Sequence, residues 1–104
     1  MATKKTPYGY DLANGRIAVN TDEAEVIKRI FADRINGLSG VKIGAALYAE
    51  KIDGFSKSEK KAVDRVYSIL NDERYCGAND YPTIISEETF KTAKESMNKK
   101  TFGK

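Results

Sequence analysis

The residues that carry most hydrolytic and metal chemistry are scarce in this chain. Its 104 residues include no histidine, no tryptophan and a single cysteine, Cys76. The lack of histidine excludes a nucleophile activated by a Ser-His or Cys-His arrangement. One cysteine cannot close an internal disulfide and, without histidine, leaves too few soft ligands for structural zinc. We therefore expect no catalytic residue, no metal site and no other cofactor.

Long apolar runs and phosphate-binding glycine loops are absent as well. No stretch approaches the roughly 18 consecutive apolar residues that a membrane-spanning helix needs, and residues 1–6 show no signal-peptide pattern. The 8 glycines are scattered at predicted turns, without a Walker or Gly-x-Gly-x-x-Gly arrangement. The acidic pairs Asp22-Glu23 and Glu87-Glu88 stand where helices are expected to begin, which suits the helix dipole better than catalysis. We expect a cytoplasmic protein with no membrane partner.

The composition is that of one small folded domain with an uneven charge. Hydrophobic residues make up 40% of the chain and charged residues 32%, and the net charge is +3. Residues 57–65 carry four cations against two carboxylates, and residues 91–104 carry five against one. This distribution suits a protein with one basic face, although lysines that only solvate the chain are an equal alternative. The expected organisation is a flexible tail over 1–6, one domain over 7–98 and a basic tail over 99–104.

The first third of the chain predicts a hairpin followed by a helix. Apolar residues alternate around Asn14-Gly15, which predicts a β-hairpin over about residues 8–19, because a type I′ turn requires positive φ at both central positions. Asn20 or Thr21 is expected to cap the helix, with Glu23 three residues after Asn20 as in a capping box, and Gly37 is expected to end it. Its inward face is expected to consist of Ile27, Ile30, Phe31 and Ile35.

Two further helices are predicted in the middle of the chain. One runs from a cap at Ser39 to about Lys51, and Gly44 would let a neighbouring helix approach it closely. The next begins at a Ser56-x-x-Glu59 capping box. The expected inward residues are Ile43, Ala46 and Leu47 in the former and Ala62, Val63, Val66, Tyr67 and Leu70 in the latter.

The last third predicts a short irregular segment and a final helix. A small strand pair is expected around Tyr75 and Ile84. The helix would open at Ser86, with Ile85 and Phe90 at the two positions of a hydrophobic staple. The predicted fold class is therefore mainly α: a small helical bundle with a helix-turn-helix-like core, an N-terminal β-hairpin and a C-terminal helix.

The outward face of the predicted third helix is a candidate for nucleic-acid binding. One row holds Lys60, Asp64 and Ser68, and the adjacent row holds Lys57, Lys61 and Arg65. Cations suit phosphates and shorter polar groups suit base edges, as a helix in the major groove requires. On the residues alone, a solvated charged face without function is the favoured alternative.

Several short motifs, in their order, resemble the recombinase domain of large serine recombinases. The chain carries Pro7-Tyr8-Gly9-Tyr10 at the entry and Ile85-Ser86-x-Glu88-x-Phe90 at the exit. The most specific stretch is Val66-x-x-Ile69-Leu70-Asn71 followed by Tyr75-Cys76-Gly77. The resemblance covers about residues 7–95. One departure is Lys61, which stands where the family often has a tryptophan.

The resemblance implies a sequence-specific double-stranded DNA-binding fragment of a site-specific recombinase, not an enzyme in itself. Its partners would be duplex DNA and the remaining domains of the parent recombinase, including the catalytic and zinc-ribbon domains, with a place at the nucleoid. A helical protein–protein interaction module and a stand-alone helix-turn-helix transcription regulator are the alternatives. The candidate DNA-binding residues are Arg16, Lys42, Lys57, Ser58, Lys60, Lys61, Asp64, Arg65 and Ser68.

Overall fold

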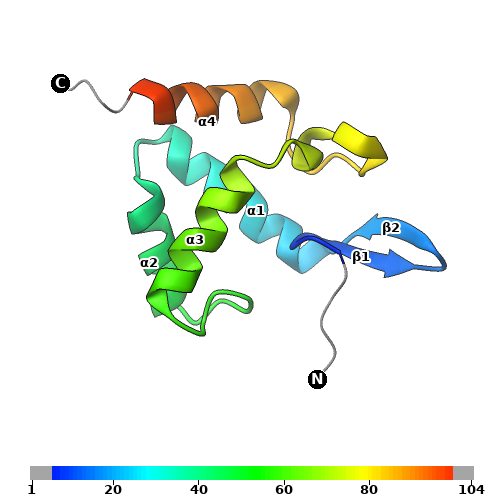
Figure 1. The fold of residues 1–104 in the computed structure, drawn as a ribbon, viewed down its shortest axis with the longest axis horizontal. Helices are drawn as coiled ribbons and strands as arrows, with labels where there is room; N and C mark the ends of the chain where they lie inside the picture. The colour runs from blue at the N-terminus through cyan, green and yellow to red at the C-terminus, as the bar shows by residue number, and fades with distance from the viewer. Residues whose placement is uncertain (1–5, 100–104) are drawn as a thin grey trace.

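A computed structural model describes residues 6–99, with side chains as far as Glu95. In this range four α-helices follow one two-stranded hairpin, which confirms the expected mainly helical fold (Figure 1). The expected tails lie outside the described residues, apart from Thr6 and the backbone of Lys99. The elements in chain order, with η for 3-10 helices, are β1 (Tyr10–Ala13), β2 (Arg16–Val19), α1 (Thr21–Ile35), α2 (Gly40–Ala49), α3 (Glu59–Leu70), η1 (Glu73–Cys76), η2 (Ala78–Asp80) and α4 (Glu87–Lys99).

The predicted hairpin forms at Asn14-Gly15. Both residues have positive φ, 53° and 77°, as a type I′ turn requires, and Tyr10 pairs with Val19 at the open end of the antiparallel ladder. Two short strands are marginal alone, and Tyr10 attaches them to the helices. Its ring is fully buried, and its hydroxyl lies 3.0 Å from the carbonyl oxygen of Arg74 and 2.6 Å from that of Pro82.

Asn20 caps α1, but the rest of the expected capping box is replaced by contacts with the hairpin. The Asn20 side chain accepts from the backbone N–H of Glu23 at 2.9 Å. The Glu23 carboxylate accepts from the N–H of Gly9 at 2.7 Å, and the N–H of Asn20 donates to the Gly9 carbonyl at 2.9 Å. The start of α1 is therefore joined to the chain just before β1.

At the C-terminal end of α1, the structure differs from the prediction at one core residue. Gly37 ends the helix at φ 103°, as expected. Ile35 is 38% exposed, whereas Arg34 is only 6% exposed. At about 100° per residue, position 34 lies closer to the direction of Ile27 than position 35 does. The Arg34 guanidinium is accommodated there by donating to the Leu38 carbonyl at 2.6 Å.

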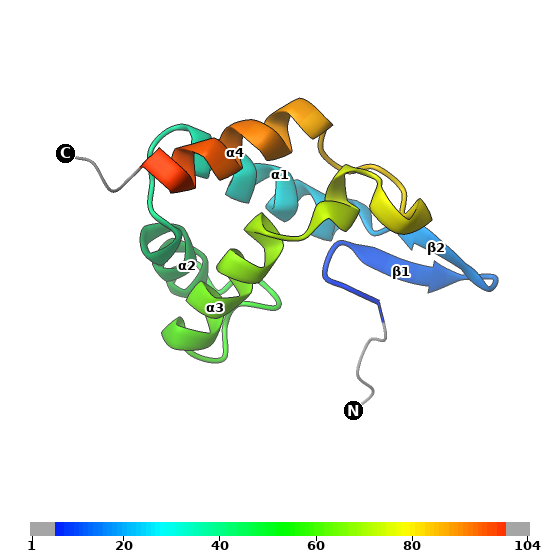
Figure 2. The same cartoon turned by 45° about the horizontal axis from the view of Figure 1, so that its top comes forward.

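The helices α2 and α3 lie side by side and make close contact at glycines of α2 (Figures 1 and 2). A Cβ on Gly44 would lie 2.6 Å from the Cα of Val63, so this glycine allows the two backbones to meet, as predicted. A Cβ on Gly40 would overlap the ring of Tyr67. Ser39 caps α2 as expected, and its hydroxyl accepts from the N–H of Lys42 at 3.1 Å.

The predicted start of α3 was wrong by two residues. Ser58, not Ser56, caps the helix and accepts from the N–H of Lys61 at 3.1 Å. Phe55 is only 1% exposed, and the exposed Ser56 and Lys57 separate this core residue from the Ser58 cap. The buried face of α3 also includes Ile69, whereas the expected core residue Tyr67 is 37% exposed.

The segment between α3 and α4 forms turns in place of the expected strand pair. The carbonyl of Tyr75 accepts from the N–H groups of both Ile84 and Ile85, at 2.9 and 3.0 Å. Between α3 and α4 the described backbone forms the 3-10 helices η1 and η2 and no β-ladder. The start of α4 is as predicted, because Ser86 accepts from the N–H of Thr89 at 3.0 Å.

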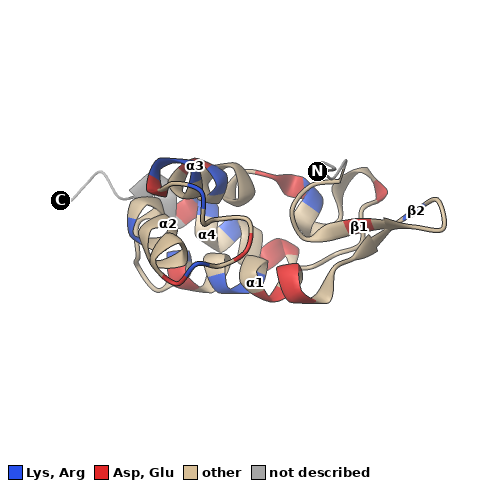
Figure 3. Ribbon diagram, turned by 90° about the horizontal axis from the view of Figure 1, so that it is seen from below, with Lys and Arg blue, Asp and Glu red and all other residues tan. Residues whose placement is uncertain are grey.

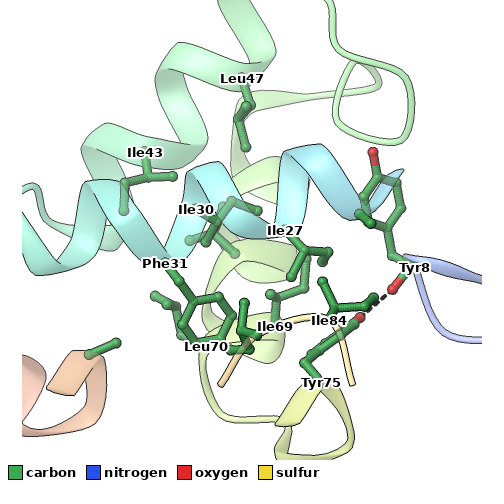
Figure 4. Packing of buried hydrophobic residues seen from close by; sticks show 14 of the residues in the cluster. Tyr8, Ile27, Ile30, Phe31, Ile43, Leu47, Ile69, Leu70, Tyr75 and Ile84 are labelled. Carbon is green, nitrogen blue, oxygen red and sulfur yellow. Dashed lines mark hydrogen bonds between the residues drawn. The ribbon is translucent and has the colours of Figure 1, made fainter. Parts of the chain in front are cut away.

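The core lies between the four helices and the segment 75–85, and Figure 4 shows its residues from α1, α2, α3 and that segment. Ile27, Ile30 and Leu70 are fully buried there. The hydroxyl of Tyr75 donates to the carbonyl of Tyr8 at 2.5 Å, which connects this segment to the chain before the hairpin. α4 covers α1 on the side away from α2 (Figure 2).

Candidate nucleic-acid interface

A groove of about 470 Å³ runs beside the outward face of α3. The rest of its lining, which we call the wall, includes residues of three segments distant in sequence: Pro7 and Tyr8, then Gly54 and Phe55, and then Asp72, Arg74 and Tyr75. Contacts between these segments fix the wall, because the Tyr8 hydroxyl donates to the Asp53 carbonyl and Tyr75 donates to Tyr8. The charged residues that line the groove are Lys57, Lys61, Asp64, Arg65, Asp72 and Arg74.

The predicted row of Lys57, Lys61 and Arg65, which we call the groove row, lies along this groove. Lys57 precedes the Ser58 cap, and the two other side chains project from successive turns of α3. All three side chains are exposed. The sequence spacing thus brings together three cations beside a concave surface.

The other predicted row has a different environment. Asp64 and Ser68 also line the groove, but Lys60 does not. The Lys60 ammonium lies 3.2 Å from the Asp64 carboxylate, with the two side chains 86% and 65% exposed. Lys60 is therefore a solvent-exposed cation whose charge is partly offset by its neighbour one turn away.

Arg65 differs from the two lysines because aromatic rings hold its side chain. Its guanidinium carbon lies 5.5 Å from the centroid of the Tyr8 ring and 5.8 Å from that of Phe55. These rings meet edge to face at 5.1 Å. Such cation–π contacts stabilise a cation without neutralising it, so Arg65 keeps its charge at the groove in a restricted set of orientations.

Arg74 and Asp72 were missed by the sequence reasoning. They line the end of the groove beyond the C-terminal turn of α3. Residues two positions apart do not share a face of a helix, so helical spacing could not identify Asp72 and Arg74 as a pair. They also lie in a segment whose turns the sequence does not predict. The available signal was the position of Arg74 directly before the Tyr75-Cys76-Gly77 motif.

Three other predicted residues occupy separate places. Arg16 is exposed at the start of β2, and Lys42 is exposed on α2; neither lines the groove. Ser58 is half-buried, and its hydroxyl accepts the capping hydrogen bond of α3. The structure thus brings Lys57, Lys61, Asp64, Arg65 and Ser68 to one groove and leaves Arg16 and Lys42 elsewhere.

Two edges of the molecule differ in their balance of charge, although both carry cations and carboxylates. Figure 3 shows Lys and Arg along α3 on one edge and Asp and Glu at the start of α1 on the opposite edge. Burial, with Glu23 and Asp53 nearby, raises the pKa of Tyr8 to about 12. The Tyr8 ring beneath Arg65 is therefore neutral at ordinary pH.

The described residues contain no group of three His, Cys, Asp or Glu side chains placed to hold a metal ion. Among the same residues, no helix is long and apolar enough to cross a membrane. Burial, together with Glu87 and Glu73, raises the pKa of the Cys76 thiol, which disfavours the thiolate.

Comparison with known proteins gives a family match and two similar folds. The family model described as Recombinase matches residues 21–100. A crystal structure of an LSR–DNA complex has a TM-score of 0.71 and 21% identity, over 95% of this chain and 33% of the other. A structure from work on sequence requirements of the Listeria innocua prophage attP site has a TM-score of 0.71 and 20% identity, over 95% and 45%. At these identities the likeness shows the fold, and this chain spans less than half of either. No curated protein matches.

Proposed function

Because the chain belongs to the recombinase family, as a recombinase domain of large serine recombinases, we propose that it binds double-stranded DNA through the groove beside α3. The observation that supports this most is the grouping of four exposed or partly exposed cations, Lys57, Lys61, Arg65 and Arg74, along one concave surface. Phosphate contacts supply most of the affinity of such interfaces, and they need cations that can approach the backbone.

The same face offers groups for sequence readout. Asp64 and Ser68 lie on α3 between the cations of the groove and are exposed. Carboxylates accept from the exocyclic amine of cytosine, and hydroxyls bond to several base edges. With α3 in the major groove, the cations would contact phosphates and these two side chains would discriminate between bases.

In this proposal the domain contributes binding and positioning, while chemistry belongs to another part of a longer recombinase. The domain would hold one half of a recombination site so that a catalytic domain meets the strand to be exchanged. The described residues offer no histidine-activated nucleophile and no metal cluster for strand cleavage. The expected outcome with supercoiled plasmid is binding without cleavage and without a covalent protein–DNA adduct.

The decisive measurement is the affinity for fluorescent duplex DNA of mixed sequence at several salt concentrations. We expect non-specific dissociation constants of about 1 to 100 µM and a log–log salt slope near −0.9 per neutralised phosphate. An acidic polypeptide of matched charge serves as competitor, because a protein-binding module with a basic surface would prefer it. Selection from random duplexes then tests sequence preference. Preference for the acidic polypeptide, or no salt-dependent binding to duplex, would refute the proposal.

A further inference from the structure

The far end of the groove contains an arginine that is held more firmly than any cation of the groove row. Arg74 donates from Nε to Asp72 Oδ1 at 2.9 Å and from Nη2 to Asp72 Oδ2 at 2.6 Å. Its guanidinium carbon also lies 5.3 Å from the centroid of the Tyr81 ring. The Arg74 side chain is nevertheless 37% exposed, against 19% for Asp72.

The backbone of this residue is fixed as well. The N–H of Arg74 donates to Asp72 Oδ1 at 3.0 Å, and the carbonyl of Arg74 accepts from the hydroxyl of the buried Tyr10 at 3.0 Å. The next residue, Tyr75, is 2% exposed and stacks on the Tyr10 ring at 5.6 Å. Both ends of the side chain are therefore held by the folded core.

We propose that Arg74 is a phosphate-binding residue at the far end of the groove and that Asp72 positions its guanidinium. The inference rests on the proposed DNA binding and adds two residues to it. Asp72 engages the Nε–Nη2 edge, and Nη1 takes no part in this pair. Tyr81 also hydrogen-bonds the guanidinium, and a phosphate would bind the N–H groups that these two residues do not occupy. A planar guanidinium fixed in advance loses less side-chain entropy on binding a phosphate than a mobile lysine does.

A carboxylate at a DNA-binding surface can weaken DNA binding through its negative charge or strengthen it by positioning a cation. The direction in which the affinity changes when the charge is removed distinguishes these two roles. If Asp72 acts only through its negative charge, removing that charge tightens binding to DNA. If it positions Arg74, removing the charge weakens binding. The hydrogen bonds from Arg74 outweigh the effect of burial and lower the pKa of the Asp72 carboxyl, so the group is ionised at neutral pH.

The test compares Asp72→Asn with Glu73→Gln in the whole chain, with a mixed-sequence duplex as probe. Both substitutions remove one negative charge, but Glu73 is an exposed neighbour, whereas Asp72 receives the hydrogen bonds of the Arg74 guanidinium. Asparagine can still accept from the N–H of Arg74, so the turn is retained. We expect Glu73→Gln to leave affinity unchanged or to raise it about twofold, and Asp72→Asn to lower it about threefold to fivefold.

Two further measurements keep the outcomes distinct. Arg74→Gln should lower affinity about tenfold and flatten the salt slope by about one unit, while Arg74→Lys should recover the slope but only part of the affinity. The Arg74 Nε–Hε resonance should shift in Asp72→Asn, but not in Glu73→Gln, without DNA. If wild type binds duplex and Asp72→Asn binds it as tightly as Glu73→Gln does, positioning is overturned and DNA binding stands. If wild type does not bind, both fail.

Discussion

The two sides of α3 are built in different ways. Towards α2, the helix is pressed against another backbone, with Val63 at the position where Gly44 leaves no side chain. Towards the groove, the same helix presents Lys61 and Arg65 to solvent, and Arg65 rests on aromatic rings. The first side excludes water by close packing, and the second keeps charge accessible at a surface of fixed shape.

This difference separates the consequences of substitution. Overpacking between two helices costs folding free energy because neither backbone can move without disturbing the core. A charge reversal on an exposed side chain changes folding little and acts on the binding of a polyanion. A single helix should therefore carry one set of substitutions that unfold the protein and another that only weaken DNA binding.

The largest effect is expected at the packed side. Gly44→Val should destabilise the fold by about 3 kcal/mol or more, because its Cβ would lie 2.6 Å from the Val63 Cα, a backbone atom. Ala49→Val is the matched control: the same side chain enters the same helix at an exposed position, with an expected cost of about 0.5 kcal/mol. Urea unfolding followed by circular dichroism measures both. Equal midpoints for the two variants would show that α2 and α3 can separate at little cost.

The next effect concerns the wall of the groove. Tyr75→Phe should destabilise the fold by about 1 to 3 kcal/mol, since it leaves the buried carbonyl of Tyr8 without its hydrogen bond from the Tyr75 hydroxyl. Tyr67→Phe removes a hydroxyl from a ring that is 37% exposed and should change the unfolding free energy by less than about 0.5 kcal/mol. Thermal melts of the two variants test the contrast, and a neutral Tyr75→Phe would mean that the wall does not depend on this bond.

Much of the fold could be predicted because its signals are local. Asn14-Gly15 determines a turn by its own backbone preferences, and Gly44 within a helical stretch indicates a close neighbour wherever that neighbour comes from. The start of α3 could not be located in this way. Two serines, Ser56 and Ser58, are both good caps, and the choice between them depends on the burial of Phe55 by distant residues.

Only the part of the candidate site that lies on α3 could be predicted, because its residues recur at helical spacing. Helical spacing places Lys61 and Arg65 on successive turns of α3, whereas Lys57 lies before the helix, and all three line the groove. The wall could not be predicted, because it forms from segments 45 and 67 residues apart that meet through tyrosine hydroxyls. Arg34 shows the same limit, since the Leu38 carbonyl, which accepts from this buried cation in the core-facing row of α1, lies beyond the end of the helix.

The third effect tests the groove side directly with two neighbouring lysines. Lys61→Glu should lower duplex affinity at least about tenfold, because Lys61 lines the groove, whereas Lys60→Glu should lower it about threefold. The two substitutions change the net charge equally, and both side chains are exposed, so the unfolding midpoints should match that of wild type. Fluorescence anisotropy at fixed salt gives both affinities. Equal losses of affinity would mean that DNA binding depends on the net charge of the protein and not on the position of a lysine at the groove.

The smallest effect is expected for the Lys60–Asp64 pair. At 3.2 Å and with both side chains mostly exposed, this ion pair is screened by water and should contribute less than about 0.5 kcal/mol to folding. A double-mutant cycle with Lys60→Ala and Asp64→Ala measures that coupling by urea unfolding. In DNA binding, Asp64→Asn should raise non-specific affinity about twofold by releasing Lys60 and removing a negative charge from the groove, while altering sequence preference if Asp64 contacts a base. A coupling above about 1 kcal/mol would show that the outer row of α3 also supports the fold, and the division between its two sides would then be less sharp than the contacts indicate.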